Sequence, residues 1–175
     1  MEALVIGIAG KARSGKDTLA EHISTLLGSD AARAAFADPV KDMLRAIGVH
    51  DIDRYKEVEH PVLRATSRRM MQTLGTEWGR DTLGEDTWIN LTREKGLGKK
   101  FLIISDVRFE NEADFVRENG ILFHVYGRGG IAGDHKSESG IEFKFGDFKL
   151  DNSYDLEFFF EQAEMILRMG GIYDS

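Results

Sequence analysis

Short apolar runs alternate along this chain with longer segments of helical periodicity. Residues 4–8 and 101–104 are continuous apolar runs, the pattern of strands that are buried on both faces of a sheet. Residues 120–126 are predicted to form another strand, and residues 32–37 a second one early in the chain. Strands separated by helices predict an α/β fold, in which helices flank a central parallel sheet.

Helical spacing of apolar residues fills the segments between these strands. Residues 18–27 carry leucine and isoleucine at helical intervals, and residues 156–169 are expected to form the last helix. A further helix is predicted from Asp38 through Ile47, with Asp38 as its N-cap and Pro39 at its first position.

The turn between the first strand and the first helix reads GKARSGKDT over residues 10–18, which fits the phosphate-loop pattern G-x-x-x-x-G-K. Glycines let successive backbone N–H groups converge on phosphate oxygens, and the following helix adds its positive N-terminal end. Lys16 would lie against the β- and γ-phosphates of a nucleotide. The alternative is a turn without a ligand, but the strand before it and the helix after it favour a phosphate loop.

Asp17 stands where this pattern usually has a serine or threonine, whose hydroxyl binds the Mg²⁺ that bridges the phosphates. A carboxylate is also a hard oxygen ligand, so Asp17 could bind the metal directly or through water. It could equally leave the metal to Thr18 and act as an anion in the first turn of the helix. The sequence does not choose between these alternatives.

Composition limits the kinds of partner that this chain can have. Its 175 residues are 42% hydrophobic and 30% charged, which is typical of one soluble domain with a substantial core. The formal net charge of −7 lacks the basic field of a duplex-nucleic-acid binder, so an anion site must be built locally. No cysteine is present for disulfides or thiolate chemistry. Without a signal-like start or a long apolar run, the expected location is the cytoplasm.

Polar residues follow the strand at residues 101–104, where ligands of open α/β sheets bind. Asp106 is the leading carboxylate, because an acid here can order Mg²⁺ or a substrate group beside the phosphate loop. The alternative is that Asp106 caps the helix that follows. For Glu110 and Glu112, the dipole of that helix is the stronger explanation.

A helix is predicted between Pro61 and Leu83, and on it Arg64, Arg68 and Gln72 recur every fourth residue. Two guanidiniums and an amide on one face could bind a phosphate and a base edge, and so recognise a nucleoside monophosphate. The alternative is a solvated basic face.

Trp78 and Trp88 offer aromatic surface near this row. Because most tryptophans lie in the core, we expect Trp78 to be buried. Trp88 could be either a core residue or a surface against which a base stacks.

Residues 128–140 follow a strand and are rich in glycine, charge and small polar residues, a composition typical of a flap. The basic residues of this flap are Arg128, His135 and Lys136. An arginine delivered to the transferred phosphoryl group would neutralise the charge that spreads over its oxygens in the transition state. The alternative is an ordinary surface loop.

Several segments together resemble the phage-type deoxynucleoside monophosphate kinases. They are GKARSGKDT at residues 10–18, QTLGTEWGR at residues 72–80, Trp88, and SDVRFENEA at residues 105–113. The segments DHKSE at residues 134–138 and LDN at residues 150–152 are also similar to that family's pattern. The GKD form of the loop recurs in the family.

The resemblance implies a P-loop kinase fold in which residues 1–175 form one domain. Within it, an acceptor-binding helical region is expected at about residues 38–95 and a small lid segment at about residues 127–150. The implied reaction transfers the γ-phosphoryl group of ATP to the 5′-phosphate of a deoxynucleoside monophosphate, with Mg²⁺. The family also implies a homodimer, and a phage-encoded protein would act in the host cytoplasm. The acidic net charge and the lack of an apolar run of membrane-spanning length predict no polymeric nucleic acid and no membrane as partners.

The same resemblance assigns roles to individual residues. ATP would be bound by Arg13, Ser14, Gly15, Lys16, Asp17 and Thr18. The acceptor would contact Asp38, Arg64, Arg68, Gln72 and Trp88, with Asp106 and Arg108 at the junction of the two substrates. The lid would contain Arg128, His135, Ser137 and Glu138. The catalytic residues would be Lys16, Arg13, Asp106 and Arg128, and the metal ligands Asp17 and Asp106.

Two other functions are compatible with these patterns. Phosphomevalonate kinases of the animal type share a similar GKxxSGKD loop, an Asp-Arg pair after a strand and a Gly-Asp-Phe segment like residues 146–148. Gln72 and the nearby tryptophans favour a nucleotide, because a mevalonate backbone has no base edge to pair with and no aromatic face. A protein that hydrolyses ATP slowly and signals to a partner is a further alternative.

Overall fold

The computed structural model describes residues 2–129 and 140–173, and the chain divides into two compact units. The first unit comprises Met1–Ala35 and Arg93–Ser175, and the second comprises Phe36–Thr92. One domain over the whole chain stays a prediction. The second unit overlaps most of the range, residues 38–95, that is expected to bind the acceptor.

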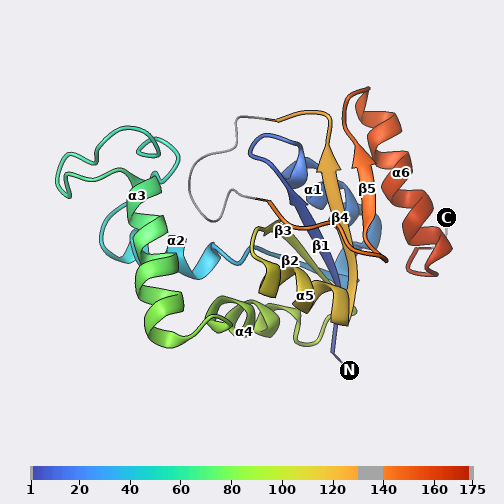
Figure 1. Ribbon diagram of the computed structural model, residues 1–175, viewed down its shortest axis with the longest axis horizontal. Helices are drawn as coiled ribbons and strands as arrows, with labels where there is room; N and C mark the ends of the chain where they lie inside the picture. The colour runs from blue at the N-terminus through green and yellow to red at the C-terminus, as the bar shows by residue number, and fades with distance from the viewer. Residues whose placement is uncertain (1, 130–139, 174–175) are drawn as a thin grey trace. The chain divides into compact units, whose positions relative to one another are not determined.

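Among the described residues, the first unit is built on a five-stranded sheet with the order β2-β3-β1-β4-β5 (Figure 1). All its pairings are parallel. The strands are β1 (Leu4–Gly10), β2 (Ala31–Ala34), β3 (Phe101–Val107), β4 (Gly120–Tyr126) and β5 (Phe148–Asp151). The predicted α/β architecture with a central parallel sheet is therefore confirmed.

Two strand boundaries differ from the prediction. β2 ends at Ala34, the last residue that pairs with β3, and not at residue 37. β3 continues to Val107 because its pairing with β1 resumes there after a bulge. From the pair Gly7 and Ile104 to the pair Ala9 and Val107, β1 advances by two residues and β3 by three. Asp106 therefore lies within the irregular end of β3 and not in the loop beyond it.

The core lies on the face of the sheet that packs against α1 (Lys16–Leu27) and α6 (Leu156–Met169). Ile6 and Ile8 of β1 point into this cluster, where they are fully buried. Successive residues of a strand face opposite sides of the sheet, so Gly7 faces the side away from this cluster. A Cβ added to Gly7 would lie 2.6 Å from the methyl groups of Val116. Val116 belongs to α5 (Glu110–Asn119), so helices cover both faces of the sheet (Figure 1).

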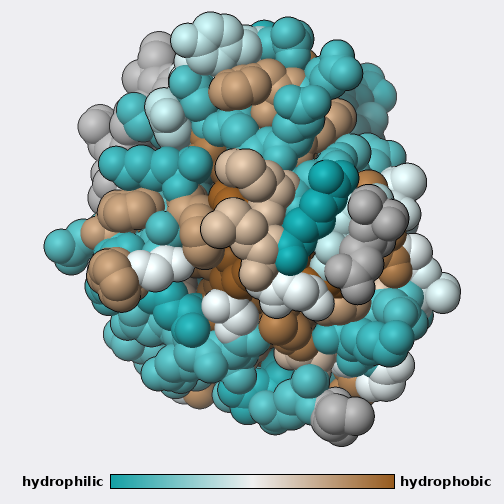
Figure 2. All heavy atoms as spheres, turned by 90° about the vertical axis from the view of Figure 1, so that its right-hand side faces the viewer, coloured by the Kyte–Doolittle hydropathy of each residue, from teal (hydrophilic) through white to brown (hydrophobic). Residues whose placement is uncertain are grey.

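Short 3₁₀ turns complete the first unit: η1 (Gly28–Asp30) joins α1 to β2, and η3 (Glu94–Gly96) precedes β3. The outer side of α6 carries exposed apolar side chains among polar ones, on the face that Figure 2 shows. The exposed apolar residues of α6 are Leu156, Phe158, Met165 and Met169. In the part of the chain that the structure describes, no helix is long and apolar enough to cross a membrane.

The second unit is helical. It contains α2 (Asp38–Ala46), α3 (Ser67–Gln72), the π-helical segment η2 (Thr73–Leu83) and most of α4 (Thr87–Arg93). The predicted helix after residue 37 is present, but its N-cap is Ala37, so that Asp38 is its first residue and not its cap. An acid in this first turn still interacts favourably with the helix dipole.

The helix expected from residue 61 begins only at Ser67. Thr66 caps it, because the Thr66 hydroxyl accepts a hydrogen bond from the backbone N–H of Arg69 at 3.2 Å. Arg64 precedes this cap in a turn and has a left-handed backbone with φ +55°. The prediction that Arg64 shares a helical face with Arg68 and Gln72 is therefore wrong.

Candidate phosphate-binding site

The phosphate loop connects β1 to α1 at the carboxyl end of the central strand. Gly15 is the N-cap of α1 and has φ +102°, a conformation that glycine adopts without steric cost. A Cβ on Gly15 would lie 2.5 Å from Nδ2 of Asn152, so the loop also leaves no room for a larger residue. Arg13 has φ +63°, which is uncommon for a residue with a side chain. The curled backbone at residues 10–15 is that of an anion-binding loop.

The side chain of Lys16 lies against this loop. Lys16 is only 9% exposed, and its Nζ donates a hydrogen bond to the carbonyl oxygen of Lys11 at 2.7 Å. The ammonium group is thus held beside the loop backbone, where the phosphate-loop pattern requires it. A phosphate oxygen that binds Nζ would compete with the Lys11 carbonyl.

Asp17 connects the loop to the end of β3. Its Oδ1 accepts a hydrogen bond from Oγ of Ser105 at 2.8 Å, and Ser105 directly precedes Asp106. Tertiary structure therefore brings Asp17 to the strand end that carries the second predicted metal ligand. Thr18, the alternative metal-binding residue, is exposed in the first turn of α1.

These oxygen donors fit a magnesium ion that is held mainly by phosphates. In the described part of the chain, no group of three or more acidic or histidine side chains could hold a metal by itself. Mg²⁺ usually binds one or two carboxylates together with waters and substrate phosphates, so two aspartates beside the loop match that requirement.

Asp106 is not the N-cap of the helix that follows β3. The N-cap of α5 is Phe109, and Oε2 of Glu112 accepts hydrogen bonds from the backbone N–H groups of Arg108 at 2.8 Å and Phe109 at 3.1 Å. Glu112 is 2% exposed and thus has a structural role at the helix start. The alternative that Asp106 is the N-cap of this helix is therefore wrong.

A cavity of about 430 Å³ opens beside the loop within the first unit. Its lining includes four cationic residues, Lys11, Lys16, Arg108 and Arg128, whereas no acidic residue is among the described residues that line it. In a chain with a net charge of −7, this local excess of positive charge fits a polyanionic ligand.

Sequence reasoning missed Lys11 and His124 as cavity residues. Lys11 occupies a position of the loop pattern that any residue can fill, so the pattern does not single it out. His124 is a polar residue within an apolar strand, and this interruption was the available signal.

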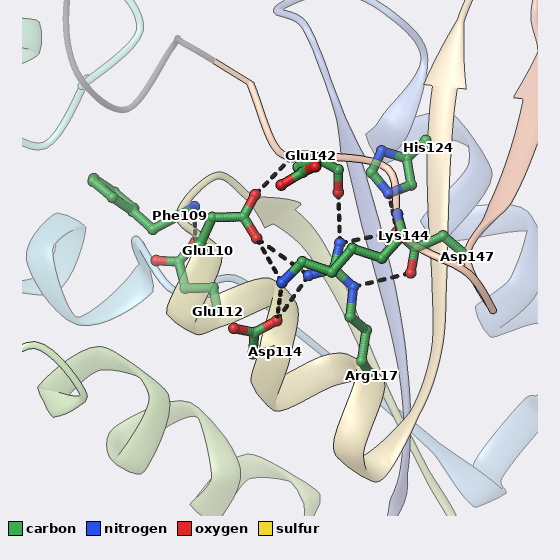
Figure 3. Close-up of polar contacts among 9 residues, drawn as sticks. All are labelled: Phe109, Glu110, Glu112, Asp114, Arg117, His124, Glu142, Lys144 and Asp147. Atoms are coloured by element: carbon green, nitrogen blue, oxygen red, sulfur yellow. Dashed lines mark hydrogen bonds and ion pairs between the residues drawn. The ribbon is translucent and has the colours of Figure 1, made fainter.

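His124 is held by an almost fully buried carboxylate (Figure 3). Its Nε2 lies 2.9 Å from Oδ2 of Asp147, whose side chain is 1% exposed. Burial raises the pKa of Asp147, but hydrogen bonds from Arg117, the Lys144 backbone N–H and His124 outweigh it and hold that pKa at about 2. Asp147 is therefore a carboxylate at neutral pH.

Arg117 is the centre of a wider ionic cluster, shown in Figure 3. It contacts Asp147 through Nε at 3.0 Å and Nη2 at 2.9 Å, and Asp114 through Nη1 at 2.8 Å. Its Nη2 also donates to the backbone carbonyl of Glu142 at 2.7 Å. Lys144 adds an ion pair with Asp114 at 2.8 Å. The cluster ties residues 142–147 to α5 and β4.

Part of the predicted lid at residues 127–150 is held against the sheet or belongs to it. Its last residues, 148–150, belong to β5, which pairs with β4 and is part of the sheet. Arg128 lines the cavity, and its Nη2 donates to the carbonyl oxygen of Tyr154 at 2.6 Å. The predicted lid residues His135, Ser137 and Glu138 lie outside the described residues, so their roles stay predictions.

In the second unit, Arg68 is the member of the predicted acceptor row with a defined ionic partner. Its Nε donates to Oε1 of Glu57 at 3.0 Å. Gln72 is the last residue of α3, where the π-helical segment begins and the spacing of side chains changes. Asp38 lies 3.8 Å from Nζ of Lys41 on α2.

The two tryptophans of the second unit differ from expectation. Trp78 is 42% exposed, so the prediction of burial is wrong, whereas Trp88 is 4% exposed. The indole N–H of Trp88 donates to the carbonyl oxygen of Gly75 at 2.7 Å, which satisfies this polar group inside the unit. Trp88 is thus a core residue.

Residues 49–163 match the family described as deoxynucleotide monophosphate kinase. A protein of Acanthamoeba polyphaga mimivirus, provisionally named a deoxynucleotide monophosphate kinase, is 30% identical over 91% of this chain and 93% of its own length. The deoxynucleoside-5′-monophosphate kinase of Escherichia phage T5 is 35% identical over 50% of this chain and 40% of its own length.

Solved structures of low sequence identity share the fold. A gluconokinase from Sinorhizobium meliloti 1021 superposes with a TM-score of 0.52 at 12% identity, over 94% of this chain and 91% of that one. A sugar kinase from Janibacter sp. has a TM-score of 0.51 at 16% identity, over 99% of both chains. These similarities confirm the predicted kinase fold with its phosphate loop.

Proposed function

Because this chain belongs to the deoxynucleotide monophosphate kinase family, we propose that it transfers the γ-phosphoryl group of ATP to the 5′-phosphate of a deoxynucleoside monophosphate. The observation that carries the proposal is the cavity beside the phosphate loop, where the charged lining residues that the structure describes are all cationic. Two polyanions that must approach each other in line require such a surface. The products are a deoxynucleoside diphosphate and ADP.

Catalysis in this site consists of charge neutralisation and positioning, with no covalent nucleophile. Lys16 exchanges its bond with the Lys11 carbonyl for the β- and γ-phosphates, and Arg13 through Thr18 form the rest of the ATP site. Arg108 and Arg128, both at the cavity, neutralise the transferred phosphoryl group. Their guanidiniums present donors in the fork geometry that phosphate oxygens accept.

Asp17 and Asp106 would hold Mg²⁺ at the loop. The support for this assignment is the hydrogen bond from Ser105 to Asp17, which joins the loop to the strand end that carries Asp106. When bound, the ion neutralises charge on the β- and γ-phosphates of ATP. Ser105 holds Oδ1 of the Asp17 carboxylate through this hydrogen bond.

The second unit supplies the deoxynucleotide site. Arg68 binds the 5′-phosphate, in competition with Glu57, and Gln72 pairs with a base edge. Arg64 and Asp38 complete this site from the turn before α3 and from the start of α2. Trp88 supports the site from the core, and the exposed Trp78 is better placed than Trp88 to stack on a base.

Further parts of the proposal concern assembly and location. The homodimer, the absence of polymeric nucleic acid among the partners and the cytoplasmic location remain predictions. The net charge of −7 supports small phosphorylated substrates over a nucleic-acid polymer. Family membership does not favour phosphomevalonate as acceptor or a switch without an acceptor.

The test is ADP release from Mg·ATP with dAMP, dGMP, dCMP, dTMP, the ribonucleotides and phosphomevalonate as separate acceptors. Turnover that depends on one or more deoxynucleotides is the expected result and defines the base range. Activity with phosphomevalonate alone, or ADP release that needs no acceptor, would contradict the proposal. The Lys16→Ala variant, purified in the same way, serves as the control for contaminating kinases.

A further inference from the structure

The turn after β5 reaches the phosphate loop through a single buried side chain. Asn152 is 3% exposed, and its Nδ2 donates a hydrogen bond to the carbonyl oxygen of Ser14 at 2.8 Å. The backbone N–H of Asn152 donates to the carbonyl oxygen of Tyr126 at 2.9 Å, at the end of β4. One residue therefore joins the ends of two strands to the loop.

The side-chain amide of Asn152 has a defined orientation. The Ser14 carbonyl can only accept a hydrogen bond, so the NH₂ group and not the oxygen of the amide must face it. The amide also lies against Gly15, where an added Cβ would come within 2.5 Å of Nδ2. Contact with the loop is thus both polar and steric.

Two buried polar atoms at this contact lack a hydrogen-bond partner among the described residues: Oδ1 of Asn152 and Oγ of Ser14. Such atoms are rare in folded proteins because their burial costs free energy, so they indicate a site that serves more than packing. An apolar side chain of similar size at residue 152 would avoid the cost at Oδ1, but it would leave the Ser14 carbonyl without its donor.

The segment that carries Asn152 is rigidly held. The side chain of Gln162 on α6 accepts from the backbone N–H of Asp151 at 2.9 Å and donates to the Asp151 carbonyl at 2.9 Å. Oδ1 of Asp151 accepts from the backbone N–H of Ser153 at 2.8 Å. These bonds fix the backbone on both sides of Asn152, so its amide is a firm support for the loop.

We propose that Asn152 is a positioning residue that sets the direction of the N–H groups in the phosphate loop. A trans peptide unit is planar, and its C=O and N–H point in opposite directions. By holding the Ser14 carbonyl, Asn152 turns the N–H of Gly15 away from itself and toward the ATP phosphates. This inference rests on the proposed function, since it takes ATP as the ligand of the loop.

The test compares Asn152→Ala and Asn152→Asp with the wild-type protein. We expect the alanine variant to raise the dissociation constant of Mg·ADP and the KM for ATP about tenfold, the effect of about 1.4 kcal/mol. The KM for the deoxynucleotide should change less than about twofold. Aspartate has the size of asparagine but places an oxygen against the Ser14 carbonyl. The aspartate variant should therefore raise the KM for ATP at least as much as the alanine variant does.

Asn119→Ala is the matched control. Nδ2 of Asn119 also donates to a backbone carbonyl, that of Phe115 at 2.7 Å, but at the end of α5. Loss of this bond should leave the KM for ATP unchanged, and melting temperatures of all variants report general destabilisation. A positioning role requires a selective rise in the dissociation constant of Mg·ADP and in the KM for ATP. A general loss of stability would not produce that selective rise.

Three results would overturn the inference. One is an unchanged affinity for Mg·ADP in both Asn152 variants, and another is an equal rise in the KM of both substrates. The third is failure of both variants to fold while Asn119→Ala folds, because a role confined to the loop leaves the fold intact. Binding of Mg·ADP is measured without an acceptor, so a failure of the proposed acceptor chemistry would appear only in the turnover of the wild type.

Discussion

The ammonium group of Lys16 lies against the loop that precedes it, where Nζ donates a hydrogen bond to the Lys11 carbonyl at 2.7 Å. The residue as a whole is 9% exposed. This arrangement keeps the charge beside the loop. In the proposed mechanism, a phosphate of ATP takes the place of the Lys11 carbonyl and forms a stronger, charge-assisted hydrogen bond. At the scale of single residues, the proposed chemistry therefore depends on where a few cations are held.

Replacement of Lys16 by alanine should remove activity and preserve the fold. We expect kcat/KM to fall by about 10²–10³-fold or more, because a charge that stabilises the transferred phosphoryl group is lost. The measurement is steady-state ADP release, with circular dichroism to confirm folding. Lys99→Ala is the control, since its Nζ also donates to a backbone carbonyl, that of Ser29 at 2.8 Å, but on the exposed surface. Full activity of Lys16→Ala would refute the loop assignment.

Replacement of Arg68 by alanine tests the acceptor site. Loss of this guanidinium should raise the KM for the deoxynucleotide about tenfold or more, or lower kcat, with little change in the KM for ATP. Initial rates with each substrate varied in turn separate these effects. The neighbouring Arg69→Ala, whose side chain is exposed, is the control. Equal kinetics of Arg68→Ala and wild type would exclude Arg68 from the acceptor site.

At the scale of elements, the ionic cluster around Arg117 holds residues 142–147 against α5 and β4. The first turn of α5 is joined to the same region through Glu112, which binds the backbone of Arg108. Arg108 and His124 both line the cavity. Two elements that shape the site are thus held by buried polar contacts outside it.

The buried carboxylate of Asp147 should make stability depend on acid pH. Its pKa in the folded protein is about 2, below the ordinary value of 3.8, so its stabilising contribution is complete above about pH 4. This contribution, about 2 kcal/mol, should be lost as the pH falls from about 4 to about 2. Urea denaturation across this range measures it.

Asp147→Asn should be less stable than wild type at neutral pH, and the difference between the two should shrink on acidification. The control is Asp30→Asn, which removes an exposed ion pair with Lys100 and should cost less than about 1 kcal/mol. A stability difference between wild type and Asp147→Asn that stays constant from pH 6 to pH 2 would contradict the assignment.

At the scale of the whole molecule, the proposed substrates are divided between two compact units. The phosphate loop, Asp106, Arg108 and Arg128 belong to the first unit, and Arg68 and Gln72 belong to the second. Each set of proposed binding residues is therefore supported by its own local packing. The two substrates should therefore slow the hydrogen exchange of backbone amides in different parts of the chain.

Hydrogen exchange can detect this difference. A non-hydrolysable ATP analogue should slow exchange at residues 10–18, whereas a deoxynucleoside monophosphate should slow exchange within Phe36–Thr92. The deoxynucleoside without its 5′-phosphate is the control, and it should protect less because Arg68 loses its ligand. Protection by the deoxynucleotide confined to the first unit would refute the division.

The sequence by itself determined the features that depend on neighbouring residues. Continuous apolar runs mark β1 and β3, and an apolar run that only His124 interrupts marks β4, because strands buried on both faces need them. Helical periodicity marks α6 from Leu156 to Met169, as the structure has it. The phosphate loop is equally local, since glycine spacing and the strand and helix around it are all visible in residues 4–27. The resemblance of the family segments then indicates the reaction.

Only the tertiary structure decided the features that join distant parts of the chain. β5 is a strand because it pairs with β4. Its four residues, FKLD, contain no apolar run from which the strand could be predicted. Trp88 is buried and Trp78 is exposed, and the packing that buries Trp88 also brings its indole N–H to the carbonyl of Gly75. The contact of Asn152 with Ser14 joins residues 138 positions apart. No local pattern encodes such a contact, because its free energy arises only when the sheet brings the two strand ends together.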